Sequence, residues 1–192
     1  MRLQHFIFWE RLPPFYKGEL VRGRYIMPWH QLPSEAPIRK VFHHESPRER
    51  YKCDAVVLCC FDSRFETTFR KFIKRIGMTY VDPIRVAGGA KCLAGNDKES
   101  ERNFVLEQIR TSVRLHQTDT VVLILHSDCG AYGGLAAFQG DTQKEAENHR
   151  LDLHRAMDFL RAEAPDLSVR AYFMDFEGVW EAYDGVAQER TA

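Results

Sequence analysis

After Arg50 the sequence alternates short apolar runs with longer amphipathic segments. The apolar runs have the length of β-strands and occupy residues 54–60 (DAVVLCC), 79–87 (TYVDPIRVA), 120–126 (TVVLILH) and 168–176 (SVRAYFMDF). The segments between them carry apolar residues at helical spacing and occupy residues 64–77, 100–116 and 142–165. Strands that alternate with helices predict an α/β fold, with a mainly parallel sheet flanked by helices on both faces. Pro83 predicts an edge strand or a bulge for 79–87.

The first fifty residues have a different composition, because they hold six of the eight prolines in the chain. Prolines interrupt both helical and strand periods, so we expect residues 1–50 to form an extended N-terminal arm and residues 51–192 to form the α/β domain. The arm is rich in aromatic residues, which favours packing on this subunit or on a neighbour. These are Phe6, Phe8, Trp9, Phe15, Tyr25 and Trp29. A natural start at Met27 is the alternative.

Charge and hydropathy limit the classes of partner. Lys+Arg and Asp+Glu both number 27, so the net charge gives no reason to expect nucleic acid or an anionic membrane surface. The apolar runs are too short to span a bilayer, and the first residues lack the pattern of a secretion signal. Five cysteines without framework spacing suit a reducing compartment. We therefore expect a cytoplasmic protein with a small-molecule partner, whose cysteines serve metal binding or catalysis.

Polar residues follow two of the predicted strands at the point where each ends. Cys60, Asp62 and Arg64 lie at or just past the end of the first strand, and the stretch HSDCG, which contains His126 and Cys129, closes the third. In parallel sheets ligands gather at the carboxyl ends of the strands. If the two strands are neighbours, two thiolates and one imidazole meet there, a set that favours zinc over magnesium or calcium. Three protein ligands leave one position open, as in catalytic zinc sites.

Each of these residues also has an ordinary structural explanation. Cys60 and Cys129 could be buried core cysteines, His126 a hydrogen-bonded core histidine, and Asp62 with Arg64 an ion pair at a helix start. All of them together at strand ends favour the metal site. The glycine-rich stretch AGGAKCLAG lacks a phosphate-loop ending, so it does not indicate a nucleotide site. Other cysteines and histidines are expected to be reduced or solvated side chains without a role at the site. These residues are Cys53, Cys59, Cys92, His43, His44, His149 and His154.

The motifs resemble those of the β-class carbonic anhydrases. CFDSR and HSDCG are similar to the family's paired Cys-x-Asp-Ser-Arg and His-x-x-Cys-Gly signatures, and DPIRVAGGA is similar to the segment between them. The resemblance runs from about Cys53 to about Gly185 and indicates a divergent branch, since Val86 stands where the family has asparagine. It implies one zinc ion per chain, held by Cys60, His126 and Cys129, with Asp62 and Arg64 as a catalytic dyad. It also implies a homodimer or higher oligomer.

The implied activity is the reversible hydration of carbon dioxide to bicarbonate by a zinc-bound hydroxide. Asp62 orients the nucleophile, and Arg64 holds Asp62 away from the metal. Backbone at Gly88, Gly89 and Gly130 is expected to approach the metal pocket. Two alternatives remain: hydrolysis of carbonyl sulfide or carbon disulfide at the same zinc ion, and a non-catalytic zinc-binding or regulatory protein whose open position is closed by Asp62.

Overall fold

The computed structural model describes residues 19–21, 24–26, 41–49, 51–95 and 98–182. The chain divides into two units, residues 1–49 and 50–192, which are described separately. Among the described residues, no helix combines the length and the apolar composition that crossing a membrane requires.

The N-terminal unit contains a short antiparallel pair of strands, β1 (Glu19–Val21) and β2 (Arg24–Ile26), in which Glu19 pairs with Ile26. The sequence predicted an extended arm without strands. The pair forms between Pro14 and Pro28, where no proline removes a backbone N–H donor from the ladder. Tyr25 lies in β2. The packing expected for the arm's other aromatic residues, including Trp9 and Trp29, falls outside the described residues.

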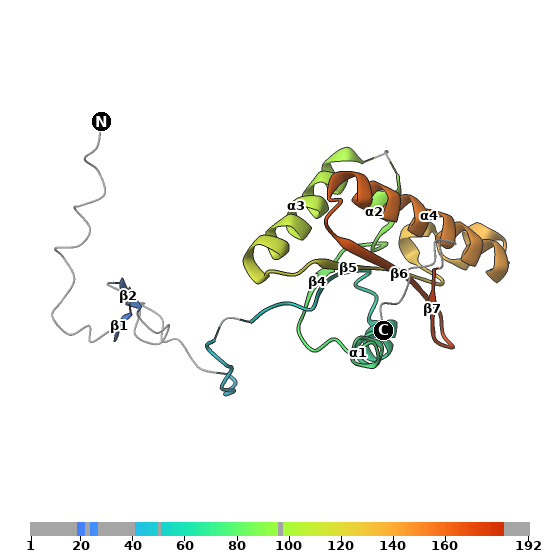
Figure 1. The fold of residues 1–192 in the computed structure, drawn as a ribbon. Helices are drawn as coiled ribbons and strands as arrows, with labels where there is room; N and C mark the ends of the chain where they lie inside the picture. The colour runs from blue at the N-terminus through green and yellow to red at the C-terminus, as the bar shows by residue number, and fades with distance from the viewer. Residues whose placement is uncertain (1–18, 22–23, 27–40, 50, 96–97, 183–192) are drawn as a thin grey trace, which may run out of the picture. The chain divides into compact units, whose positions relative to one another are not determined.

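The larger unit is built on a five-stranded sheet (Figure 1). Its strands are β3 (Ala55–Cys59), β4 (Val81–Arg85), β5 (Thr120–His126), β6 (Ser168–Met174) and β7 (Val179–Glu181). The order is β4-β3-β5-β6-β7, with parallel pairing throughout except for β7, which runs antiparallel to β6. The predicted mainly parallel sheet is confirmed, and Pro83 lies on an edge strand. Strand β7 was not predicted, because three residues carry too little periodicity.

Helices cover both faces of this sheet. Helix α1 (Glu66–Arg75) lies on one face, preceded by the 3₁₀ turn η2 (Ser63–Phe65), and the other face carries α2 (Lys91–Ala94), α3 (Glu99–His116) and α4 (Thr142–Glu163) (Figure 1). Two further 3₁₀ turns, η3 (Gly130–Tyr132) and η4 (Leu135–Phe138), connect β5 to α4. The predicted amphipathic segments are therefore helices, with short turns added at their ends.

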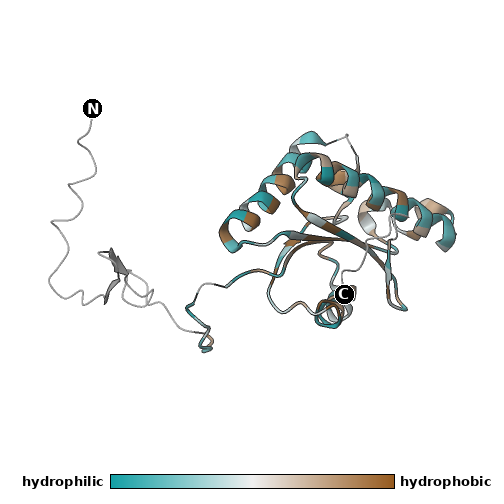
Figure 2. Ribbon diagram, in the orientation of Figure 1, coloured by the Kyte–Doolittle hydropathy of each residue, from teal (hydrophilic) through white to brown (hydrophobic). Residues whose placement is uncertain are grey.

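The alternation of side chains along the strands divides the core into two layers. Val56, Leu58 and Leu123 face the layer under α2, α3 and α4, whereas Val57 and Ile124 face α1. Apolar residues accordingly concentrate along the strands and the inner helix faces (Figure 2). Burial on both faces explains why the strands appear in the sequence as continuous apolar runs.

Helix α4 buries one face, as predicted from Leu153, Ala156, Met157 and Leu160. The expectation of a solvated His149 was wrong, because this residue is 0% exposed. Its position four residues before Leu153 places it on the same helix face as the apolar residues. Its Nδ1 donates to the Glu145 carbonyl at 2.7 Å, and the rings of Tyr132, Phe138 and Phe173 surround it.

We expect the buried His149 to make the protein sensitive to acid. Burial lowers its pKa below the ordinary 6.5. The unfolded chain therefore binds a proton that the folded state does not, and stability falls as the pH drops from 6.5 through the folded pKa. When the pH is lowered from 7.5 to 5.5, the unfolding free energy of both proteins should fall. The fall should be smaller in His149→Leu than in the wild-type protein, by about 1 kcal/mol. Urea unfolding at the two pH values measures this. His44→Leu, at an exposed histidine, is the control. An equal fall in unfolding free energy between the two pH values for His149→Leu and wild type would contradict the prediction.

Candidate metal centre

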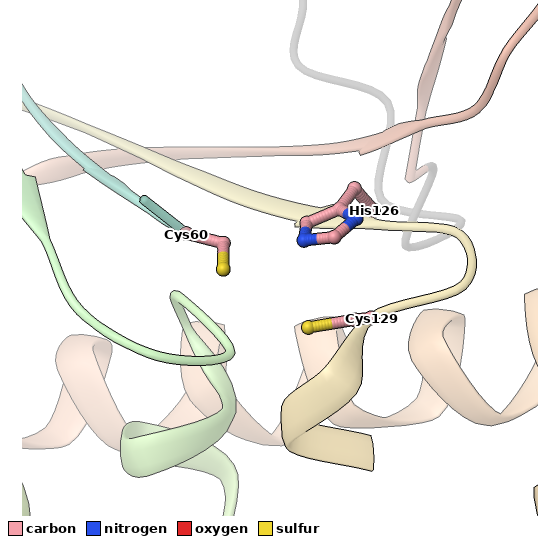
Figure 3. Close-up of side chains that lie close together, drawn as sticks. All are labelled: Cys60, His126 and Cys129. Carbon is pink, nitrogen blue, oxygen red and sulfur yellow. The ribbon is translucent and has the colours of Figure 1, made fainter. Parts of the chain in front are cut away.

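The sheet brings the two motif-bearing strands side by side. β3 pairs directly with β5, with Val56 opposite Val121 and Leu58 opposite Leu123, so their carboxyl ends meet at one edge. Cys60 follows the last residue of β3, and His126 is the last residue of β5. The turn after β5 then returns Cys129 toward the same point, and all three side chains face a common space (Figure 3).

The three side chains form a ligand set of the right size. One ligand atom from each of Cys60, His126 and Cys129 lies within 4.8 Å of the other two. Ligands at about 2.3 Å from a tetrahedral metal lie about 3.8 Å apart, so small movements would close the set around an ion. Within the described residues, this is the one group of three or more Cys, His, Asp or Glu side chains so arranged.

His126 is oriented as a metal ligand would be. Its Nδ1 donates to the carbonyl of Ser127 at 2.8 Å, which leaves the lone pair on Nε2. This Nε2 is buried and meets no hydrogen-bond partner in the described part of the chain. The ring packs against Phe65 with centroids 4.7 Å apart. A buried acceptor without a partner is costly, and a metal ion at this position would satisfy it.

The two sulfur atoms lie within 4.8 Å of one another. The neighbouring Cys129 thiol lowers the pKa of Cys60, and the neighbouring Cys60 raises the pKa of Cys129. One thiolate is thus favoured over two, and a bound cation would hold both sulfurs as thiolates. The donor set of two thiolates and one imidazole fits zinc.

Asp62 and Arg64 form a two-pronged ion pair beside the ligand set. Arg64 Nε lies 3.1 Å from both carboxylate oxygens of Asp62, and Nη2 donates to Oδ2 at 2.7 Å. Asp62 also caps η2 by accepting the backbone N–H of Arg64. Hydrogen bonds from Arg64 lower the pKa of Asp62 to about 2, so it is a carboxylate throughout the neutral range.

A small cavity lies beside Asp62, Cys60 and His126. Its volume is about 20 Å³, enough for one water molecule. Cys60, Asp62, His126 and Arg85 supply its polar wall. Apolar side chains supply much of the rest, namely Phe65, Phe69, Ile124 and Met174. Asp62 can therefore act on a molecule held beside Cys60 and His126.

The glycines near the site differ in what they require. A Cβ on Gly89 would lie 2.6 Å from the Ile124 carbonyl oxygen and 2.9 Å from the Cys60 nitrogen, and φ there is +53°. Gly88 also has positive φ, and a Cβ there would lie 3.0 Å from Ala131 Cβ. The backbone after β4 thus passes close to the ends of β3 and β5. A Cβ on Gly130, in contrast, would have no described atom within 4 Å, so this position needs no glycine for steric reasons.

Gly89→Ala should therefore destabilise the domain strongly. The new methyl group would collide with backbone atoms of two central strands, which cannot move aside, so we expect a loss of about 3 kcal/mol or more in unfolding free energy. Gly130→Ala is the matched control and should change stability by less than about 0.5 kcal/mol. Urea denaturation measures both, and similar midpoints for the two variants would show that the strands tolerate the methyl group.

Sequence reasoning missed two residues that shape this site. Asp128 lies inside the HSDCG motif and contacts Arg64, but no pattern in the sequence indicated a partner for it. Glu145 is 1% exposed on α4 and accepts the backbone N–H of Asp128 at 2.7 Å. The sequence did show a carboxylate, Asp128, between His126 and Cys129, although it did not show which residue the carboxylate contacts. Glu145 had none, because it lies on a different element.

Comparison with known proteins agrees with the geometry. Residues 50–183 match a family model described as "Putative carbonic anhydrase". The chain belongs to this carbonic anhydrase family. The match covers the described α/β unit from the start of its first strand to the end of β7, so it includes both motifs and the segment between them.

Two relatives of this family member come from Rickettsia. An uncharacterised protein of Rickettsia conorii is 28% identical over 151 residues, covering 74% of this chain and 81% of the relative. An uncharacterised protein of Rickettsia bellii is 26% identical over 151 residues, covering 74% of this chain and 92% of the relative. Among solved structures, the β-carbonic anhydrase isoform I of Trichomonas vaginalis has a TM-score of 0.50 at 10% identity, covering 75% of this chain and 90% of that chain. The last similarity shows a shared fold.

Proposed function

We propose that this carbonic anhydrase family member catalyses the reversible hydration of carbon dioxide to bicarbonate at a zinc ion. Cys60, His126 and Cys129 would hold the metal, one ion per chain. The observation that carries the proposal is the convergence of these three ligand atoms within 4.8 Å, beside a carboxylate that an arginine holds in place. Three protein ligands leave the open position that catalysis requires.

The chain's own residues supply the remaining functions. Zinc bound at such a site acts as a Lewis acid that lowers the pKa of a water molecule and so supplies a nucleophile near neutral pH. Asp62, ionised and facing the same cavity as Cys60 and His126, accepts a hydrogen bond from water there and orients it. Arg64 keeps that carboxylate from closing the open position.

Apolar walls complete the arrangement. Phe65, Ile124 and Met174 limit the access of bulk water to the cavity, which strengthens the electrostatic interactions inside it. Val86, which stands where the β-class pattern has asparagine, packs against the core layer under α2, α3 and α4. The charged side chains that line the cavity are those of Asp62 and Arg85.

Stopped-flow hydration of carbon dioxide on metal-quantified protein tests the proposal. We expect hydration that scales with zinc content, and little release of sulfide from carbonyl sulfide under the same conditions. Sulfide release in place of hydration would assign the site to another linear substrate. Bound zinc with neither activity would indicate a regulatory or binding protein in which Asp62 occupies the open position.

A further inference from the structure

The Asp128 carboxylate contacts the dyad from the opposite side. Its Oδ2 accepts from Arg64 Nη1 at 2.8 Å, and its backbone carbonyl accepts from Nη2 at 2.9 Å. The same guanidinium donates Nε and Nη2 to Asp62. Arg64 is thus held at both ends, by residues that follow two different strands. Its position depends on the turn after β5 as much as on its own loop.

Asp128 is itself held in an unusual conformation. Its φ of +49° lies in the left-handed region, which residues other than glycine rarely adopt. The buried Glu145 accepts its N–H at 2.7 Å, and its Oδ1 accepts the N–H of Leu135 at 3.0 Å. A Cβ on Gly134 would lie 2.9 Å from that Oδ1, so the turn is shaped to admit the carboxylate. One oxygen is thereby committed to the turn and the other to Arg64.

We propose that Asp128 is a positioning residue for the dyad, which fixes Arg64 so that Asp62 stays off the metal. This inference rests on the proposed metal site. The Arg64 side chain is 44% exposed, and a single exposed ion pair contributes little to holding a side chain in place. The second carboxylate turns the pair into a network with anchors on both motifs, which restricts the guanidinium far more than either contact alone.

Loss of Asp128 should therefore act through Asp62. Without the Asp128 carboxylate, only the backbone carbonyl of residue 128 holds Arg64 on this side. The Arg64 and Asp62 side chains then gain freedom to move together, and the Asp62 carboxylate becomes a competitor for the open position. A purely structural role for Asp128 in the turn predicts something different, namely a disturbance that does not depend on whether residue 62 is an acid. A double-mutant cycle separates the two.

The test measures azide binding to the cobalt(II)-loaded full-length protein by visible absorption, since azide competes with Asp62 for the same position. Asp128→Asn preserves the side chain's size and a residue type that tolerates positive φ. It should weaken azide affinity about tenfold in the wild-type background and less than about twofold in the Asp62→Asn background. Asp158→Asn, at an exposed ion pair on α4, is the matched control and should leave the affinity unchanged.

Arg64→Lys provides a second route to the same result. A lysine keeps the charge but cannot span both carboxylates, so it should also weaken azide binding. This loss of affinity should disappear when Asp62→Asn is present as well. Equal losses in both backgrounds, or no loss in either, would overturn the role of Asp128. Failure of the wild-type protein to bind cobalt would overturn the metal site together with this inference. Failure of carbon dioxide hydration would overturn only the proposed activity, because azide titration needs no substrate.

Discussion

Replacing Cys129 by serine is expected to strip the metal from the protein. The wild-type chain should retain about one zinc ion after dialysis against a chelator, whereas the variant should retain less than about a tenth of that. The hydroxyl of serine is a far weaker ligand than a thiolate, and its loss leaves two protein ligands. We expect the affinity for zinc to fall by more than about 100-fold, because losing a residue that only hydrogen-bonds to a metal ligand already costs up to about 100-fold. Metal analysis by mass spectrometry measures the content.

Stability should fall with the metal, because binding free energy contributes to folding. Cys60→Ser should behave like Cys129→Ser. Cys92→Ser is the matched control, since Cys92 is a half-buried cysteine outside the ligand set and burial raises its pKa to about 11, so it remains a thiol. Full zinc occupancy in the Cys60 and Cys129 variants would refute the ligand assignment.

Arg64→Ala should keep its metal and lose most of its activity. The substitution removes the guanidinium that orients the Asp62 carboxylate. The freed carboxylate then competes with water for the open position. We expect carbon dioxide hydration to fall by about 100-fold or more, the scale of a lost acid–base function. Raising the pH should recover part of the activity, because hydroxide then competes better with the carboxylate. Stopped-flow measurements between pH 7 and pH 9 provide the test.

A matched control lies further along the same segment. Arg70 pairs with Glu66 at 2.6 Å on the exposed side of α1. Arg70→Ala removes this arginine and its ion pair, while Glu66 keeps its ion pair with Arg85, which lines the cavity. It should retain wild-type hydration. A fully active Arg64→Ala protein with an unchanged pH profile would reduce Arg64 to a helix-start charge and remove the argument for an open site.

The local pattern of the sequence determined much of the fold. Valine-rich runs on β3 and β5 specify strands buried on both faces, and the spacing of Phe69 and Ile73 specifies the amphipathic α1. The rule that parallel strands end together then placed Cys60 and His126 at one edge. These inferences succeeded because periodicity and strand direction act over short stretches of chain.

The arm and His149 show where such local reasoning fails. Prolines argued against strands before residue 50, yet a thirteen-residue stretch free of proline includes both β1 and β2. His149 was assigned to solvent because it is polar and lies off the metal spacing. Its spacing from Leu153 and Ala156 carried the opposite signal, and the surrounding rings offset the cost of burying a neutral imidazole.

The sequence by itself determined which side chains the candidate site contains: two cysteines, one histidine and an Asp/Arg pair at the ends of two strands. Only the tertiary structure decided that β3 and β5 are neighbours, because strand order depends on how the helices pack across the whole sheet. It alone showed Arg64 contacting Asp128, 64 residues away, and Glu145 holding that turn from α4. Contacts of this kind arise between elements that each fold by their own local pattern, so no stretch of sequence contains them.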